Sequence, residues 1–270
     1  MITSTSNAKV KRLVNLRRKR RARDEEKVFL TEGLRMFQEA PAEELLELYI
    51  TEKFFKKEKT LVKEKCEKSG CRFEILSDSV MEYVSDTQHP QGVLCVVRQR
   101  NTGGQEVISA KQAHRTGNRN PLILVLDNLQ DPGNLGTIFR TGEAAGVTGI
   151  LMSRDCVDVY NPKVVRSTMG AIFRMPFCYA ESLTEVIQEM KTQGIYTYAA
   201  HLGGACIYDE PDYRKPSAFF IGNEGNGLSD EVAGLADCCL KIPMEGCVES
   251  LNAAIAATVL VFEAGRQRRH

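Results

Sequence analysis

Short apolar runs alternate with amphipathic stretches along most of this chain. In the first hundred residues, this pattern predicts a strand, a turn at Glu32-Gly33 and an amphipathic helix within 27–40. It also predicts strands over 45–51, 72–76 and 92–98, and a Lys/Glu-rich helix over 54–68. Strands that alternate with helices are typical of a small α/β unit, which we place at residues 1–98.

The stretch from 99 to 120 is polar, contains Gly103-Gly104 and lacks a sustained apolar period. Such a composition is typical of a connection between two domains. We therefore predict an interdomain linker over 99–120, followed by a second domain over 121–270.

The second domain has a sharper pattern. The expected strands are 122–126, 149–152, 195–200, 218–221 and 240–242. The expected helices are 135–145, 162–169, 183–194, a short one after Ser229, and a terminal one over 250–268. This alternation predicts an α/β fold with a parallel sheet that is covered on both faces and binds ligands at the carboxyl ends of its strands.

Composition indicates a globular protein, with 43% hydrophobic and 26% charged residues in a chain of 270. Nine cysteines without a CxxC pair indicate reduced thiols, so we expect a reducing, cytoplasmic compartment. The start lacks an apolar leader, and the longest apolar stretch, 253–262, is shorter than the roughly 20 residues that span a bilayer. We expect no membrane association.

Positive charge is concentrated near the amino terminus, although the net charge is only +1. Nine basic residues fall within 9–23: Lys9, Lys11, Arg12, Arg17, Arg18, Lys19, Arg20, Arg21 and Arg23. Such a run suits RNA, because each neutralised phosphate releases a counterion. The alternative is a solvated basic helix or tail. The apolar residues between the charges, at helical spacing, favour a helix docked by one face.

Three polar blocks follow apolar runs of the second domain, where strands should end. They are DPGNLGTIFRTG at 131–142, FIGNEGNGL at 220–228 and IPMEGCVESLNAA at 242–254. The motifs GxxxxGK[ST], HExxH, GxSxG and a strand-turn GxGxxG are absent, and the four histidines are scattered. These absences disfavour a nucleotide or metal hydrolase, and we expect no metal site.

Residues 121–270 resemble the SpoU (TrmH-like) branch of the SPOUT RNA methyltransferases through these blocks in order. The matching positions are Asn134, Gly136, Arg140, Gly222, Glu224, Gly225, Gly227, Pro243, Ser250, Leu251 and Asn252. The segment NPKVVRSTMGA at 161–171 also resembles the family's sequence between its first two motifs. The first 98 residues resemble the ribosomal-protein-like substrate-binding domain of several ribosomal RNA 2′-O-ribose methyltransferases.

The resemblance implies a carboxyl-terminal trefoil knot that binds S-adenosylmethionine. The cofactor site it implies, extended to the end of the preceding strand, comprises Ala200, His201, Gly222, Gly227, Ile242, Met244 and Leu251. The implied catalytic residues are Asn134, Arg140, Glu224, Ser250 and Asn252. Deprotonating an arginine at neutral pH costs roughly 7–8 kcal/mol, so we favour a charged Arg140 that holds the ribose hydroxyl and an adjacent phosphate.

Each of these residues also has a structural interpretation. Asn134, Ser250 and Asn252 are good helix caps, Arg140 suits a helix surface, and Glu224 suits a turn. The stripe Leu251, Ile255, Val259 and Phe262 is most simply the buried face of the terminal helix, which in the family also contributes to a homodimer. We predict a homodimer in which Arg140 acts with groups of the second subunit.

The sequence therefore predicts an S-adenosylmethionine-dependent RNA 2′-O-ribose methyltransferase, with ribosomal RNA favoured as substrate. A transfer RNA 2′-O-methyltransferase, a non-catalytic RNA-binding or ribosome-assembly protein, and an enzyme acting on a small molecule stay as alternatives. The complete set of motif residues argues against loss of catalysis, and the basic arm argues against a small-molecule substrate.

Overall fold

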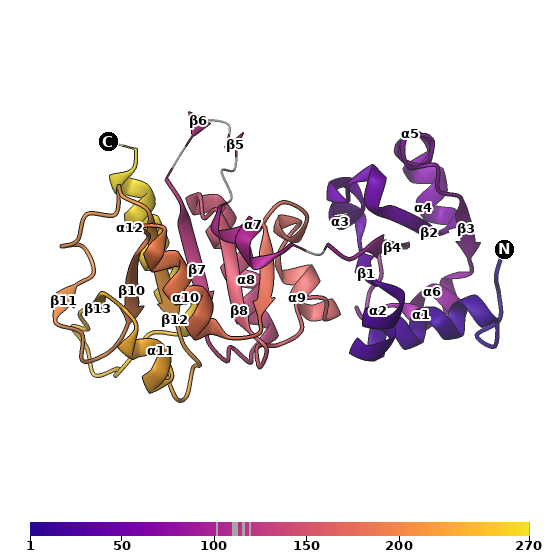
Figure 1. Ribbon diagram of the computed structural model, residues 1–270. Coiled ribbons are helices and arrows are strands. Elements are labelled where there is room, and N and C mark those ends of the chain that lie inside the picture. Colours follow the sequence, from indigo (N-terminus) through magenta and orange to yellow (C-terminus); the bar gives the residue numbers. More distant parts are fainter. Residues whose placement is uncertain (101, 110–112, 115–116, 119, 270) are drawn as a thin grey trace. The chain divides into compact units, whose positions relative to one another are not determined.

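The computed structural model describes residues 1–100, 102–109, 113–114, 117–118 and 120–269. The chain forms two compact units (Figure 1). Unit 1 contains Met1–Arg100 and Asp158–Phe173, and unit 2 contains Asn101–Val157 and Arg174–His270. The 158–173 segment therefore packs with the amino-terminal unit, although the sequence division placed it in the second domain.

Unit 2 is built on a seven-stranded sheet in the order β11-β13-β10-β12-β7-β8-β9. Every neighbouring pair in it is parallel, as the sequence predicts. Its strands are β7 (Leu122–Leu126), β8 (Gly149–Ser153), β9 (Phe177–Ala180), β10 (Tyr196–Ala200), β11 (Cys206–Ile207), β12 (Ser217–Ile221) and β13 (Cys238–Lys241). A separate hairpin pairs β5 (Ala113–His114) with β6 (Gly117–Asn118).

Helices cover both faces of this sheet. They are α7 (Gly104–Ile108), α8 (Pro132–Ala145), α10 (Leu183–Thr192), α11 (Asp230–Gly234) and α12 (Ala253–Gln267). Apolar side chains of α7, α10 and α11 share one core with the sheet residues Ile123, Val125 and Phe220. The α8 helix packs over Leu124, which lies between Ile123 and Val125 in β7 and therefore faces the other side of the sheet. On that side, α12 packs against α8 and β12. This two-sided burial explains why the central strands are apolar throughout.

Unit 1 contains a mixed sheet in the order β1-β4-β2-β3. β1 and β2 each pair with β4 antiparallel, and β2 pairs with β3 parallel. The strands are β1 (Val28–Glu32), β2 (Leu45–Thr51), β3 (Phe73–Leu76) and β4 (Val93–Arg98). The helices are α1 (Ala8–Arg18), α2 (Arg20–Glu26), α3 (Leu34–Glu39), α4 (Glu52–Lys57), α5 (Lys59–Ser69), α6 (Asp78–Val84) and α9 (Pro162–Ser167), with short 3-10 turns η1 (Ala42–Glu44) and η2 (Ala171–Phe173).

The basic amino-terminal segment is a docked helix, as its apolar spacing predicts. Val10, Leu13 and Leu16 of α1 are fully buried in a core shared with β1, β4 and α6, and Val14 packs beside them. The burial fixes the orientation of α1, so its charged residues occupy defined positions.

Three local predictions differ from the structure. The helix expected over 54–68 is two helices, because the chain breaks at Glu58 between α4 and α5. The stripe expected to be buried on the terminal helix is wrong for Ile255 and Phe262, which are 49% and 43% exposed. The predicted linker contains α7, whose Val107 and Ile108 lie in the core of unit 2, while residues 101, 110–112, 115–116 and 119 lie outside the described residues.

Within the described part of the chain, no helix combines the length and apolarity needed to cross a bilayer.

Candidate active site

The three polar blocks meet at the carboxyl edge of the parallel sheet. They follow β7, β12 and β13, whose carboxyl ends lie at the same edge because the strands are parallel. A cavity of about 510 Å³ opens there. All seven residues predicted to bind the cofactor line it: Ala200, His201, Gly222, Gly227, Ile242, Met244 and Leu251. Glu224 and Ser250 line the same cavity.

The 222–228 loop closes on itself beside the cavity. The main-chain groups of Asn223 and Gly227 exchange two hydrogen bonds, both 2.9 Å long. A Cβ atom at Gly222 would lie 2.1 Å from the carbonyl carbon of Gly227, and Gly227 itself has φ +71°. Both glycines are therefore required by the loop's own conformation, since a side chain at either position would collide or be strained.

Three of the five predicted catalytic side chains form a hydrogen-bonded chain. Asn134 Nδ2 donates to Glu224 Oε1, and Asn252 Nδ2 donates to Asn134 Oδ1 at 3.0 Å. These bonds join all three blocks, although the residues are 90 and 118 positions apart in sequence. The chain of bonds orients the Asn134 amide with its nitrogen toward the carboxylate.

The helix-cap interpretation divides among these residues. Asp131, not Asn134, is the N-cap of α8, and its carboxylate accepts from the Asn134 N–H at 2.8 Å. Asn252 does cap α12, because its Oδ1 accepts from the N–H groups of Ala254 and Ile255. The oxygen of the Asn252 side chain thus caps the helix, while its amide nitrogen donates to Asn134. Ser250 caps no described helix.

Arg140 and Ser250 do not join this hydrogen-bonded chain. Arg140 is exposed on α8, and its guanidinium has no hydrogen bond or ion pair with any residue that the structure describes. Ser250 is exposed at the cavity. In a single chain, the site therefore contains an assembled amide–carboxylate group, whereas Arg140 lies on α8 outside the residues that line the cavity.

Asp127 also has a structural role at this edge. Its carboxylate accepts from both the N–H and the hydroxyl of Ser229, at 3.0 and 2.7 Å, and so ties the end of β7 to the start of α11. Asn223, which is not among the predicted site residues, accepts from Gly225 in its own loop and donates to the carbonyl oxygen of Asn128 after β7. The sequence signal for Asn223 is its position directly before Glu224 in the second polar block.

The nine basic residues of the arm are not equivalent. Lys9, Arg12, Arg20 and Arg21 form ion pairs with carboxylates of unit 1, and Arg17 bonds carbonyls of α6 and the residue after it. Arg23 is only 4% exposed and pairs with Asp158, so its predicted contact with RNA does not fit its position. Lys11, Arg18 and Lys19 are exposed and have no partner among the described side chains.

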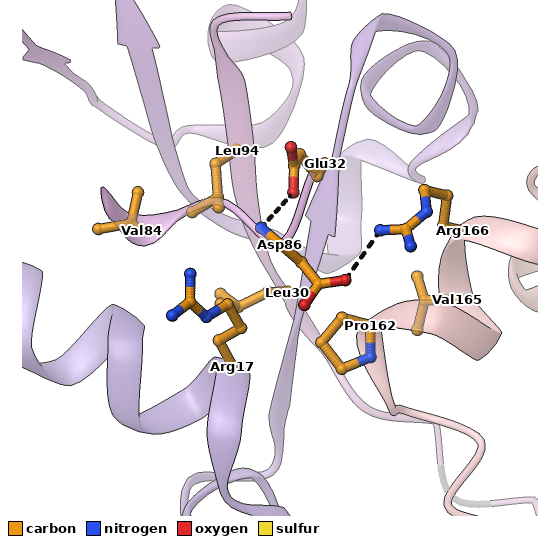
Figure 2. Close-up of a pocket in the computed structure, with 9 residues that line it drawn as sticks. All are labelled: Arg17, Leu30, Glu32, Val84, Asp86, Leu94, Pro162, Val165 and Arg166. Atoms are coloured by element: carbon orange, nitrogen blue, oxygen red, sulfur yellow. Dashed lines mark hydrogen bonds and ion pairs between the residues drawn. The ribbon is translucent and has the colours of Figure 1, made fainter. Parts of the chain in front are cut away.

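The segment that follows the first motif is bonded into unit 1. Figure 2 shows Asp86 between Glu32 and Arg166: its N–H donates to Glu32, and its carboxylate accepts from Arg166, both at 3.0 Å. The cavity lined by these residues and Arg17 has a volume of about 20 Å³, enough for roughly one water molecule. It is therefore a packing feature and not a ligand site.

Together, a parallel α/β sheet, a loop-lined cavity at its carboxyl edge and convergent amide and carboxylate groups define an α/β enzyme domain that binds a small molecule beside a polar reaction site. Residues 121–262 match the SpoU rRNA Methylase family, and residues 7–95 match the MRM3-like substrate binding domain. The chain belongs to the SpoU rRNA methylase family.

Relatives support this assignment over most of the chain. An uncharacterized tRNA/rRNA methyltransferase of Synechocystis is 38% identical over 72% of this chain and 67% of its own length. The 23S rRNA (guanosine(2553)-2′-O)-methyltransferase of Bacillus subtilis is 30% identical over 97% of each chain. The crystal structure of an AdoMet-bound rRNA methyltransferase from Sinorhizobium meliloti has a TM-score of 0.85, with 30% identity, and covers 98% of this chain and 97% of its own.

Proposed function

We propose that this protein transfers a methyl group from S-adenosylmethionine to a ribose 2′-hydroxyl of RNA, and that its target is ribosomal RNA. The observation that carries the proposal is the hydrogen-bonded chain of Asn134, Glu224 and Asn252 beside the cavity. This chain puts side chains that can hydrogen-bond a hydroxyl next to a cavity that suits a small cofactor.

The cavity fits the cofactor that the family uses. Its walls come from three segments, 200–202, 221–228 and 240–256, and include apolar residues such as Ile242, Met244 and Leu251, which suit an adenosine ring. When bound, S-adenosylmethionine supplies an electrophilic methyl group on a sulfonium centre. The chain's residues hold the ligand through backbone groups and exclude water from the apolar walls.

The polar residues orient the hydroxyl that receives the methyl group. Asn134 and Glu224 hold the ribose, and Ser250 lies exposed on the cavity side. The planar guanidinium of Arg140 donates to the 2′-oxygen and an adjacent phosphate. The transfer would exchange the sulfonium S–CH3 bond for an O–CH3 bond, leave a neutral thioether and release the hydroxyl proton to solvent. These residues contribute the alignment of the oxygen and the stabilisation of its developing negative charge.

The active form is a homodimer. Ile255 and Phe262 of α12 are exposed, and Val259 between them is half-buried. Arg140 lies on α8, which packs against α12. An apolar stripe beside an unpaired arginine supports an interface that buries the stripe and brings Arg140 to the second subunit's site.

Unit 1 and its arm supply RNA contacts. Lys11, Arg18 and Lys19 carry the free positive charge that phosphates require. We keep a substrate-binding domain over 1–98 and a methyltransferase domain over 121–270 as the functional division. Within the predicted linker at 99–120, α7 packs with the second unit, and 158–173 packs with the first. We also keep the carboxyl-terminal trefoil knot and the cytoplasmic location, to which the nine free cysteines lend support.

The test is transfer of a labelled methyl group to total RNA that lacks this protein's modification, measured under single-turnover conditions. Arg140→Lys keeps the charge and loses the planar pair of donors. We expect the unaltered protein to label RNA and Arg140→Lys to be strongly impaired with cofactor and RNA binding intact. A near-wild-type rate for Arg140→Lys would refute the bidentate role, and absence of transfer despite cofactor binding would refute the proposed reaction on free RNA.

A further inference from the structure

The loop that carries Glu224 is held by the side chain of its neighbour, Asn223. Asn223 Oδ1 accepts from the N–H groups of Gly225 at 2.8 Å and Asn226 at 3.3 Å. Its Nδ2 donates to the carbonyl oxygen of Asn128 at 2.9 Å. With the two main-chain bonds to Gly227, the main-chain N–H and C=O, the side-chain oxygen and the side-chain nitrogen of Asn223 each form at least one bond within the protein.

The carbonyl that accepts from Asn223 belongs to a rigid turn. Asn128 has φ +53°, a left-handed conformation that few non-glycine residues adopt. Its N–H donates to Ser153 Oγ at 2.8 Å, and the next N–H, of Leu129, donates to Cys156 Sγ at 3.3 Å. Burial raises the pKa of the Cys156 thiol, so the thiol stays protonated and donates to Leu126 O at 3.4 Å. These bonds fix the direction of the Asn128 carbonyl.

The far end of the loop is tied to the same strand end. Ser229 donates two hydrogen bonds to Asp127, the residue before Asn128. The 222–228 loop is therefore anchored on both sides to the end of β7, and α8, which carries Asn134, begins five residues after Asp127. The distance between Glu224 and Asn134 depends on these anchors.

We propose that Asn223 is a positioning residue for methyl transfer, which holds the Glu224 carboxylate against Asn134 by bonding the loop to the Asn128 carbonyl. The inference rests on the proposed function of Glu224. The position requires an acceptor for two N–H groups and a donor for a carbonyl on one short side chain, and asparagine is the residue that supplies both. Aspartate supplies the acceptor alone.

Asn223→Asp tests this directly, because it keeps the acceptor and turns an oxygen toward the Asn128 carbonyl. We expect the single-turnover rate to fall by roughly 10- to 100-fold, as for a small displacement of a catalytic group. Dissociation constants for S-adenosylmethionine and RNA should stay within about threefold. Asn223 lines the cavity, so a loss of cofactor affinity that accounts for the slower rate would overturn the proposal.

Asn120→Asp is the matched control. Asn120 Nδ2 donates to Arg214 O at 2.8 Å, so the same type of bond joins the segments that precede β7 and β12. This variant should lose a similar amount of thermal stability and keep the wild-type rate. Equal rate losses in the two variants would mean that Asn223 stabilises the sheet only, which overturns the proposal.

A double mutant separates this inference from the proposed function. If Asn223 acts through Glu224, adding Asn223→Asp to Glu224→Ala should lower the rate no further. Additive losses would overturn the positioning role and leave the proposed function intact. A wild-type rate for Glu224→Ala alone would instead refute the catalytic role of Glu224 on which the inference rests.

Discussion

Replacing Asn134 by alanine should slow methyl transfer strongly and barely affect folding. Asn134 is the central member of the hydrogen-bonded chain, so alanine removes its bond to the Glu224 carboxylate and its bond from Asn252. A hydrogen bond to a charged group contributes about 1.5–3 kcal/mol and a neutral one about 0.5–1.5 kcal/mol. Together they account for roughly 2–4 kcal/mol of orientation, or about a 30- to 1,000-fold lower rate.

The same change should cost little stability because Glu224 and Asn252 are exposed in the free protein, where water can replace the lost partner. In the complex, bound RNA covers the site and excludes that water, so the lost bonds lower the rate. The assay is single-turnover transfer of labelled methyl at saturating cofactor and RNA, with unfolding measured in parallel. Ser182→Ala, which removes the N-cap of α10, is the control: it should lower stability by about 1 kcal/mol and leave the rate unchanged. A rate for Asn134→Ala within about threefold of wild type would refute the orienting role.

Three further predictions follow from the arm and the helices. Replacing Lys11, Arg18 and Lys19 by glutamine should weaken RNA binding and reduce the slope of log K against log salt by about 2–3. Replacing the ion-paired Arg20 and Arg21 should change this slope less. Equal changes in slope would contradict the assignment of RNA contacts to the three unpaired residues. Arg23→Met should lower the free energy of unfolding by about 3–5 kcal/mol because it leaves Asp158 without its ion-pair partner. If the variant instead binds RNA more weakly at unchanged stability, Arg23 contacts RNA and its structural role is refuted. The double mutant Ile255→Asp/Phe262→Asp should be monomeric in sedimentation and inactive. If Arg140 and Asn134 act across subunits, mixing Arg140→Ala protein with Asn134→Ala protein should restore part of the activity. No recovery in confirmed mixed dimers would refute the shared site.

Local patterns predicted most strands and helices correctly. The runs at 122–126 and 45–51 coincide with β7 and β2, and Ser182 caps α10 as its spacing from Glu185 predicts. These features depend on neighbours within a few residues, so sequence alone contains them. The parallel sheet followed from the alternation of strands and helices, and the family followed from the order of the three motifs. The residues that the motifs predict for the cofactor line the cavity at the strand ends.

Long-range contacts account for what the sequence did not reveal. The basic run gives no sign that Arg23 is buried, because its partner Asp158 lies 135 residues away. The Asn223 bond to Asn128 spans 95 residues in the same way. Helical spacing on α12 identified an apolar stripe, but the spacing is the same whether the stripe faces a core or a second subunit, so the exposure of Ile255 and Phe262 was missed.

The position of the transferred methyl group tests the central claim most directly. RNA methylated by the unaltered protein is digested to nucleosides, which are separated and identified by mass spectrometry. The account predicts a single 2′-O-methylnucleoside, absent when Asn134→Ala replaces the active protein. A methyl group on a base, or equal labelling by Asn134→Ala, would contradict it.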